Sequence, residues 1–176
     1  PFPKPHLLVE NASLGLTNLS ENDYLINTSN LKIYISLRDI YLRSFKNFIS
    51  TEISNTNLEF ELADLKKIRK HLYEKVNQPV IFSNCKIFLT NKNKEVILIS
   101  PVDRILYKIN NKSRIKNLFI NGEIFGLNFK SEWKRSYDDP KISSQNIIFY
   151  NPLIEIKNKF EFENIKKFNG QIEMEF

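Results

Sequence analysis

Apolar and polar residues alternate with a period of two along most of the chain, which is the pattern of a β-strand with one buried and one solvated face. The segment 31–38 shows this most clearly, because its odd positions carry leucine or isoleucine and its even positions carry lysine, tyrosine, serine and arginine. The same period recurs in the segments 81–89, 105–109, 124–133, 153–162 and 171–176. The pattern therefore predicts a mainly β protein with roughly nine or ten strands.

Short polar stretches between these segments predict the turns. Asn91–Lys94 and Asn110–Ser113 each separate two alternating segments and predict hairpins. The dipeptide Asn121-Gly122 tolerates the positive backbone angles of a two-residue turn, so we also expect a hairpin that reverses there.

The segment 48–62 reads as a strand whose apolar positions change phase. Ile53 and Leu58 are five positions apart, which in a regular strand would place them on opposite faces. A bulge near Asn55 would bring both side chains to the same face.

The segment 64–76 breaks the period of two and predicts an amphipathic helix. Asp64 is a suitable N-cap, apolar residues then recur at helical spacing, and Pro79 prevents the helix from continuing. Four cations on this helix are candidate contacts for lipid headgroups, or simply a solvated face: Lys66, Lys67, Arg69 and Lys70. A second, shorter helical turn is expected within 37–45.

Composition excludes several classes of protein. With 41% hydrophobic and 26% charged residues the chain has enough apolar material to fold. Cys85 is the single cysteine and there are two histidines, so neither an internal disulfide nor the usual ligand set of a zinc site is expected. The net charge of +6 would suit an anionic partner, but lysine is so frequent here that we discount it and do not expect nucleic acid as a partner.

The sequence shows no arrangement of residues that would carry catalysis. His6 follows a proline-rich start and His71 lies on the basic helix, and neither has a recognisable nucleophile beside it. Asp138-Asp139 stands next to a proline, which is typical of a turn rather than of an acid–base pair. We expect no enzymatic activity and no cofactor.

The order of the predicted elements resembles that of a known family. A proline-led entry, Pro3–Leu14, leads into a first strand, and Asn30–Tyr41 gives a second strand that runs into Ser36-Leu37-Arg38-Asp39-Ile40-Tyr41. A third strand ends near Asn57–Phe60, before the helix and the hairpin around Asn84. This order is similar to the N-terminal periplasmic region of the AsmA-like family, bacterial envelope proteins of the AsmA/TamB type that are related to bridge-like lipid-transfer proteins.

The resemblance implies a long, twisted antiparallel sheet curled into a U-shaped trough, a β-taco. Residues 1–176 would be a single β-rich domain and a fragment of a longer chain, which an anchor outside this sequence holds at the inner membrane. It would lie in the periplasm, bind phospholipid or another acyl-chain lipid, and take part in phospholipid transport and outer-membrane assembly. The inward-facing apolar residues would line the groove: Ile33, Ile35, Leu58, Phe60, Ile87, Leu89, Ile97, Ile99, Ile105, Ile109, Phe125, Leu127, Phe129, Ile154 and Ile156.

Two other interpretations fit the same alternation. A closed β-sandwich would bury its apolar faces against each other and would serve as a protein-interaction module of the bacterial envelope, without a ligand. A nucleic-acid-binding protein is supported by the net charge alone, and its affinity would fall steeply with salt.

Overall fold

The computed structural model describes residues 4–15, 25–28, 30–43, 48–65, 68, 76–136, 138–139, 141–162 and 168–175. These residues are mainly β-structure, as the alternation predicts. The first half of the chain contains β1 (His6–Val9), β2 (Ala12–Gly15), β3 (Leu25–Thr28), β4 (Asn30–Ile35), α1 (Leu37–Tyr41), β5 (Phe48–Ser54), β6 (Asn57–Glu61), the 3-10 turn η1 (Leu62–Asp64) and β7 (Val80–Thr90). The second half contains β8 (Val96–Asn110), β9 (Ile115–Ile124), β10 (Leu127–Ser136), β11 (Ile142–Tyr150), β12 (Leu153–Phe162) and β13 (Phe168–Glu175).

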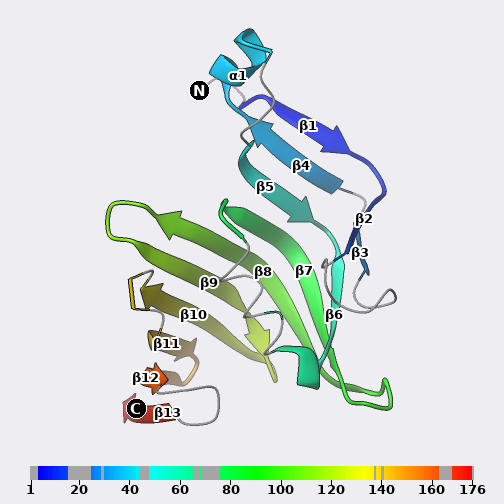
Figure 1. Ribbon diagram of the computed structural model, residues 1–176. Helices are drawn as coiled ribbons and strands as arrows, with labels where there is room; N and C mark the ends of the chain where they lie inside the picture. Colours follow the sequence, from blue (N-terminus) through cyan, green and yellow to red (C-terminus); the bar gives the residue numbers. More distant parts are fainter. Residues whose placement is uncertain are drawn as a thin grey trace.

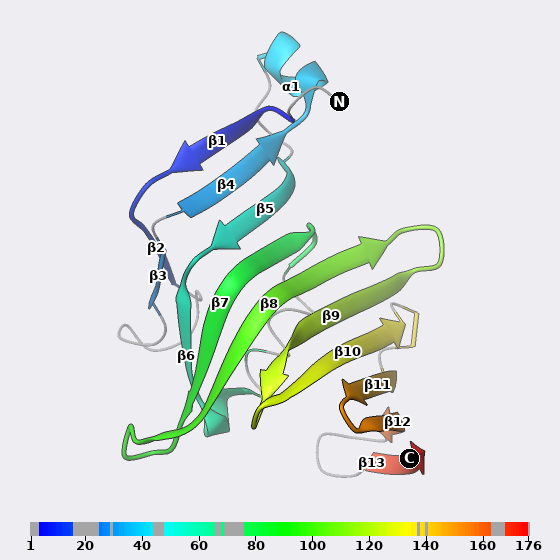
Figure 2. The same cartoon turned by 180° about the vertical axis from the view of Figure 1, so that it is seen from behind.

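Eleven of the described strands form one sheet that does not close on itself. The strands follow the order β1-β4-β5-β7-β8-β9-β10-β11-β12-β13, and β6 pairs with β7 beyond the end of β5 (Figure 1). The same order is seen from behind in Figure 2, where β1 and β13 lie at opposite ends of the sheet. The strands β2 and β3 form a separate two-stranded sheet.

The sheet is mixed, whereas the family resemblance implies an antiparallel one. Neighbouring strands from β7 to β13 pair antiparallel, as expected for consecutive hairpins. The strands β5 and β6, however, both pair parallel to β7. A parallel neighbour cannot be reached through a tight turn, so the connection between Glu61 and Val80 has to cross over the sheet. Alternation within a strand carries no information about strand direction, which is why the sequence does not reveal this crossover.

The phase change expected near Asn55 is present, and it extends to a second strand. Asn55 separates β5 from β6 with a φ of 55°, and Asn84, at the corresponding position of β7, has a φ of 52°. The backbone pairing continues past this point, because the amide of Asn55 donates to the carbonyl of Ser83 over 3.0 Å. Both Ile53 and Leu58 are consequently buried, on the same side of the sheet.

The hairpin predicted at Asn121-Gly122 is wrong in position. Both residues lie inside β9, and the chain reverses at Phe125-Gly126, where φ is 52° and 79°. Gly122 serves a different purpose, since a Cβ atom there would lie 2.5 Å from the carbonyl oxygen of Pro101 on β8. The glycine allows β8 to approach β9 closely and is not part of a turn.

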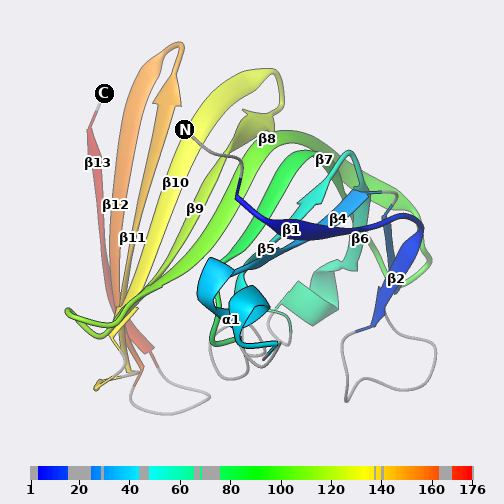
Figure 3. The same ribbon diagram turned by 90° about the horizontal axis from the view of Figure 1, so that it is seen from above.

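The helical predictions fare differently. The turn expected within 37–45 is confirmed by α1. The helix expected over 64–76 lies mostly outside the described residues. Of that region the structure shows the end of η1 at Asp64 and helical backbone at Leu65 and Ile68. Seen from above, the sheet bends around the side on which η1 lies (Figure 3).

Candidate functional site: the apolar face of the sheet

One face of the sheet carries apolar side chains from β4 to β13, and we call it the apolar face. Residues directly opposite each other on paired strands share a face, so the strand registers define its members. They include Leu31, Ile33, Ile35, Ile53, Leu58, Phe60, Phe82, Cys85, Ile87, Leu89, Val102, Ile105, Tyr107, Ile109, Leu118, Ile120, Leu127, Phe129, Ile147, Phe149, Ile154, Ile156, Phe160, Ile172 and Met174.

The part of the apolar face on β4 to β8 is covered and forms the core. Leu58 and Tyr107 are the largest fully buried side chains among the described residues, and Cys85 on β7 is buried as well. The hydroxyl of Tyr107 donates a hydrogen bond to the carbonyl oxygen of Val76 over 3.1 Å. The end of the crossover connection therefore packs against this part of the sheet. Burial raises the pKa of the Cys85 thiol, as expected for a small core residue rather than a reactive one.

Toward β13 the apolar face becomes accessible. The ring centroids of Phe129 and Phe149 lie 6.1 Å apart on β10 and β11. On β12 the ring of Phe160 lies over Gly170 of β13, whose missing side chain leaves room for it. At the edge, Ile172 and Met174 are 67% and 52% exposed. An exposed apolar surface of this kind is typical of a site that binds something apolar.

Polar side chains interrupt the apolar face near the end of β10. Lys116 on β9 is directly opposite Arg135 on β10, and Ser143 of β11 is the next residue in the same row. Lys116 and Ser143 are both buried. In the neighbouring row, the side-chain amide of Asn158 on β12 donates to the side-chain oxygen of Gln145 on β11 over 3.2 Å. The apolar surface thus has a polar boundary at one end of its strands.

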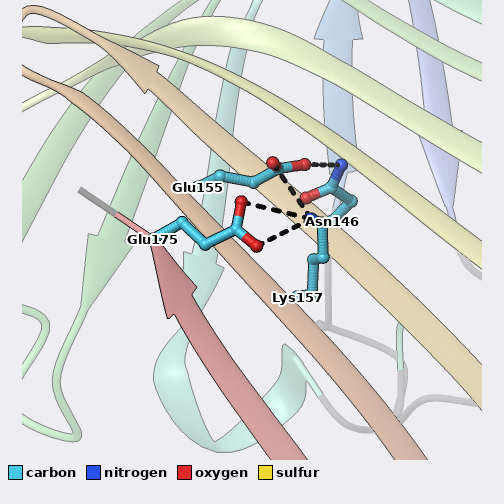
Figure 4. Close-up of polar contacts among 4 residues, drawn as sticks. All are labelled: Asn146, Glu155, Lys157 and Glu175. Atoms are coloured by element: carbon cyan, nitrogen blue, oxygen red, sulfur yellow. Dashed lines mark hydrogen bonds and ion pairs between the residues drawn. The ribbon is translucent and has the colours of Figure 1, made fainter.

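The opposite face is polar over β11 to β13 (Figure 4). The side-chain amide of Asn146 donates to the carboxylate of Glu155 over 2.8 Å. The ammonium of Lys157 lies 3.2 Å from the carboxylate of Glu155 and 3.5 Å from that of Glu175. The hydrogen bond from Asn146, together with Lys157, lowers the pKa of Glu155. A hollow of about 340 Å³ beside this network is lined by polar and charged residues such as Glu132.

Most of the groove residues predicted from the sequence lie together on the apolar face. Those placed there are Ile33, Ile35, Leu58, Phe60, Ile87, Leu89, Ile105, Ile109, Leu127, Phe129, Ile154 and Ile156. Three are not. Ile99 is opposite Phe88 on the other face, Ile97 shares that face, and Phe125 lies in the β9–β10 turn with its side chain 82% exposed.

The sequence-based selection also missed members of the apolar face. Tyr107, Phe149, Phe160, Ile172 and Met174 all lie on it. Their alternation is visible in the sequence, and extending one phase through each strand would have found them. The candidate headgroup cations Lys66, Lys67, Arg69 and Lys70 lie outside the described residues.

The described residues contain no cluster of three or more metal-ligating side chains, and none of their helices is long and apolar enough to span a membrane. No family model matches the chain, and no curated protein matches it significantly.

Proposed function

We propose that the apolar face binds acyl chains, and that the chain is a lipid-binding segment of a periplasmic AsmA-like protein in phospholipid transport and outer-membrane assembly. The observation that carries this proposal is the accessible end of the apolar face, where Ile172 and Met174 are exposed on an open sheet. An acyl chain that covers these side chains would remove them from water, which stabilises the complex by about 25 cal/mol per Å² of buried apolar surface.

The arrangement of the sheet supports several chains bound in sequence rather than one enclosed ligand. Strands lie about 4.8 Å apart, so the part of the apolar face beyond the covered core, from β9 to β13, extends over about 20 Å. In this proposal the sheet is curled as a U-shaped trough that holds the acyl chains, while the headgroups of the bound lipids remain in water. An anchor outside this sequence holds the protein at the inner membrane. Contacts to aliphatic chains are not directional, so no single residue is indispensable.

The test is native mass spectrometry of the purified chain, followed by organic extraction and lipid analysis. We expect phospholipid in near-stoichiometric amount, and a reduction of about tenfold in Ile172→Glu and Ile156→Glu, because a carboxylate there would have to be desolvated by the acyl chain. Ile172 is exposed, so its substitution leaves the folded sheet intact. The matched control is Gln171→Glu, which adds the same charge on the same strand but on the polar face.

A folded chain that carries no lipid, or equal lipid retention in all three variants, would contradict the proposal. The first result would favour a protein-interaction module of the envelope, in which an apolar protein surface covers this face.

A further inference from the structure

The short helix α1 is well formed although none of its residues is buried. Ser36 is its N-cap: the amide of Asp39 donates to the Ser36 hydroxyl over 3.0 Å, and this hydroxyl donates to the Asp39 carboxylate over 2.6 Å. The helix ends where the amide of Leu42 donates to the carbonyl of Arg38 over 2.9 Å and Arg43 takes a φ of 50°.

This lack of burial is unusual for the residue types involved. Leu37 is 73% exposed and Tyr41 88% exposed, and Ile40 and Leu42 are also exposed. Helices this short gain most of their stability from burying an apolar side, and no side chain of α1 is buried. Several large apolar side chains presented together in this way mark a contact surface.

The charges around α1 indicate what that contact is. Arg38 and Arg43 flank the apolar side chains and are exposed, while the one acidic residue of the helix, Asp39, is held by the N-cap. Figures 1 and 2 show α1 beyond the ends of β1 and β4, away from β13. The helix therefore presents aliphatic and tyrosine side chains together with two guanidinium groups. It does so at a corner of the molecule remote from β13, where the apolar face is accessible.

We infer that α1 and Leu42-Arg43 dock on a bilayer surface that carries anionic headgroups. The leucine and tyrosine side chains enter the interface between headgroups and acyl chains, and the two arginines bind lipid phosphates. A helix of five residues offers far less than the roughly 800 Å² per partner of a stable protein interface, whereas a bilayer requires no complementary shape. This surface is separate from the apolar face and goes beyond the proposed function.

The test is co-sedimentation of the whole chain with vesicles of phosphatidylcholine, with and without phosphatidylglycerol. We expect binding to the anionic vesicles that weakens with added salt. The triple variant Leu37→Ser, Tyr41→Ser, Leu42→Ser should lower the partition coefficient about tenfold or more, and Arg38→Gln with Arg43→Gln should remove the preference for anionic vesicles. These side chains are not buried, so the variants keep the fold, which circular dichroism verifies.

The matched control is a triple variant at three other exposed apolar residues: Val96→Ser, Ile99→Ser and Leu153→Ser. It should bind the anionic vesicles as the unchanged chain does. Equal losses in the control and α1 variants, or undiminished binding of the α1 variant, would overturn the inference. So would a dimer in sedimentation velocity that the α1 variant abolishes, because the occupant would then be a second copy. The two proposals are tested separately. The α1 variant should still co-purify with lipid if the apolar face binds acyl chains, and Ile172→Glu should still bind vesicles if α1 docks on the bilayer.

Discussion

Asn55 and Asn84 set which side chains share a face. Both residues hold the left-handed conformation, at corresponding positions of adjacent strands. This conformation costs other L-residues free energy that asparagine and glycine largely avoid. Because the backbone turns over at both positions together, pairing with β7 is kept while the alternation restarts. Ile53 and Leu58 then both contribute to the core.

Substitution of Asn84 tests this role. Asn84→Val should lower the free energy of unfolding by about 1–2 kcal/mol, because a β-branched residue is strained at a φ of 52°. Asn84→Gly should change it by a few tenths of a kcal/mol only. Urea unfolding followed by circular dichroism measures both values. A valine variant as stable as the glycine variant would show that the left-handed conformation is not required there.

The strand β8 explains why part of the candidate site could not be predicted from the sequence. It is one continuous strand, Val96–Asn110, but pairs with β9 only from Val102 onward. The earlier part therefore has an unpaired edge, which is where a proline such as Pro101 is tolerated. The register with β9 also shifts between Val102 and Arg104. Residues of the same parity before and after this point therefore lie on opposite faces of the sheet. The shift places Ile99 and Ile105 on opposite faces, although both occupy odd positions in the sequence.

A pair of alanine substitutions distinguishes the two faces. Leu58→Ala should destabilise the protein by about 2–5 kcal/mol, because Leu58 is 1% exposed in the covered core. Ile99→Ala should cost about 0.5 kcal/mol or less, because that side chain is 52% exposed on the other face. Denaturant unfolding gives both values. Comparable losses would mean that Ile99, too, belongs to a buried surface.

At the scale of the whole molecule, alternation predicts the fold class and most strands but not their arrangement. The hairpins from β7 to β13 connect neighbours in sequence, so local turn chemistry predicts most of them, although not the position of the β9–β10 turn. In the β7–β8 turn, for example, the Asn91 side chain accepts hydrogen bonds from the amides of Asn93 and Glu95 over 2.9 and 3.0 Å. The parallel placement of β5 and β6 depends on contacts distant in sequence, such as that of Tyr107 with Val76. No pattern within a strand reports such contacts.

The covered core does not extend along the whole sheet. Its buried apolar side chains lie on β4 to β8 and on β10, and no apolar residue described on β11, β12 or β13 is buried. Local opening requires less free energy where fewer apolar contacts are lost. The last three strands should therefore separate transiently while the core remains folded, and amide hydrogen exchange followed by mass spectrometry should be faster in β12 and β13 than in β7 and β8. Equal protection would indicate that the sheet opens only as a unit. A sheet that frays from this edge exposes fresh backbone and apolar surface without global unfolding, so a ligand could enter sideways between strands rather than through an end.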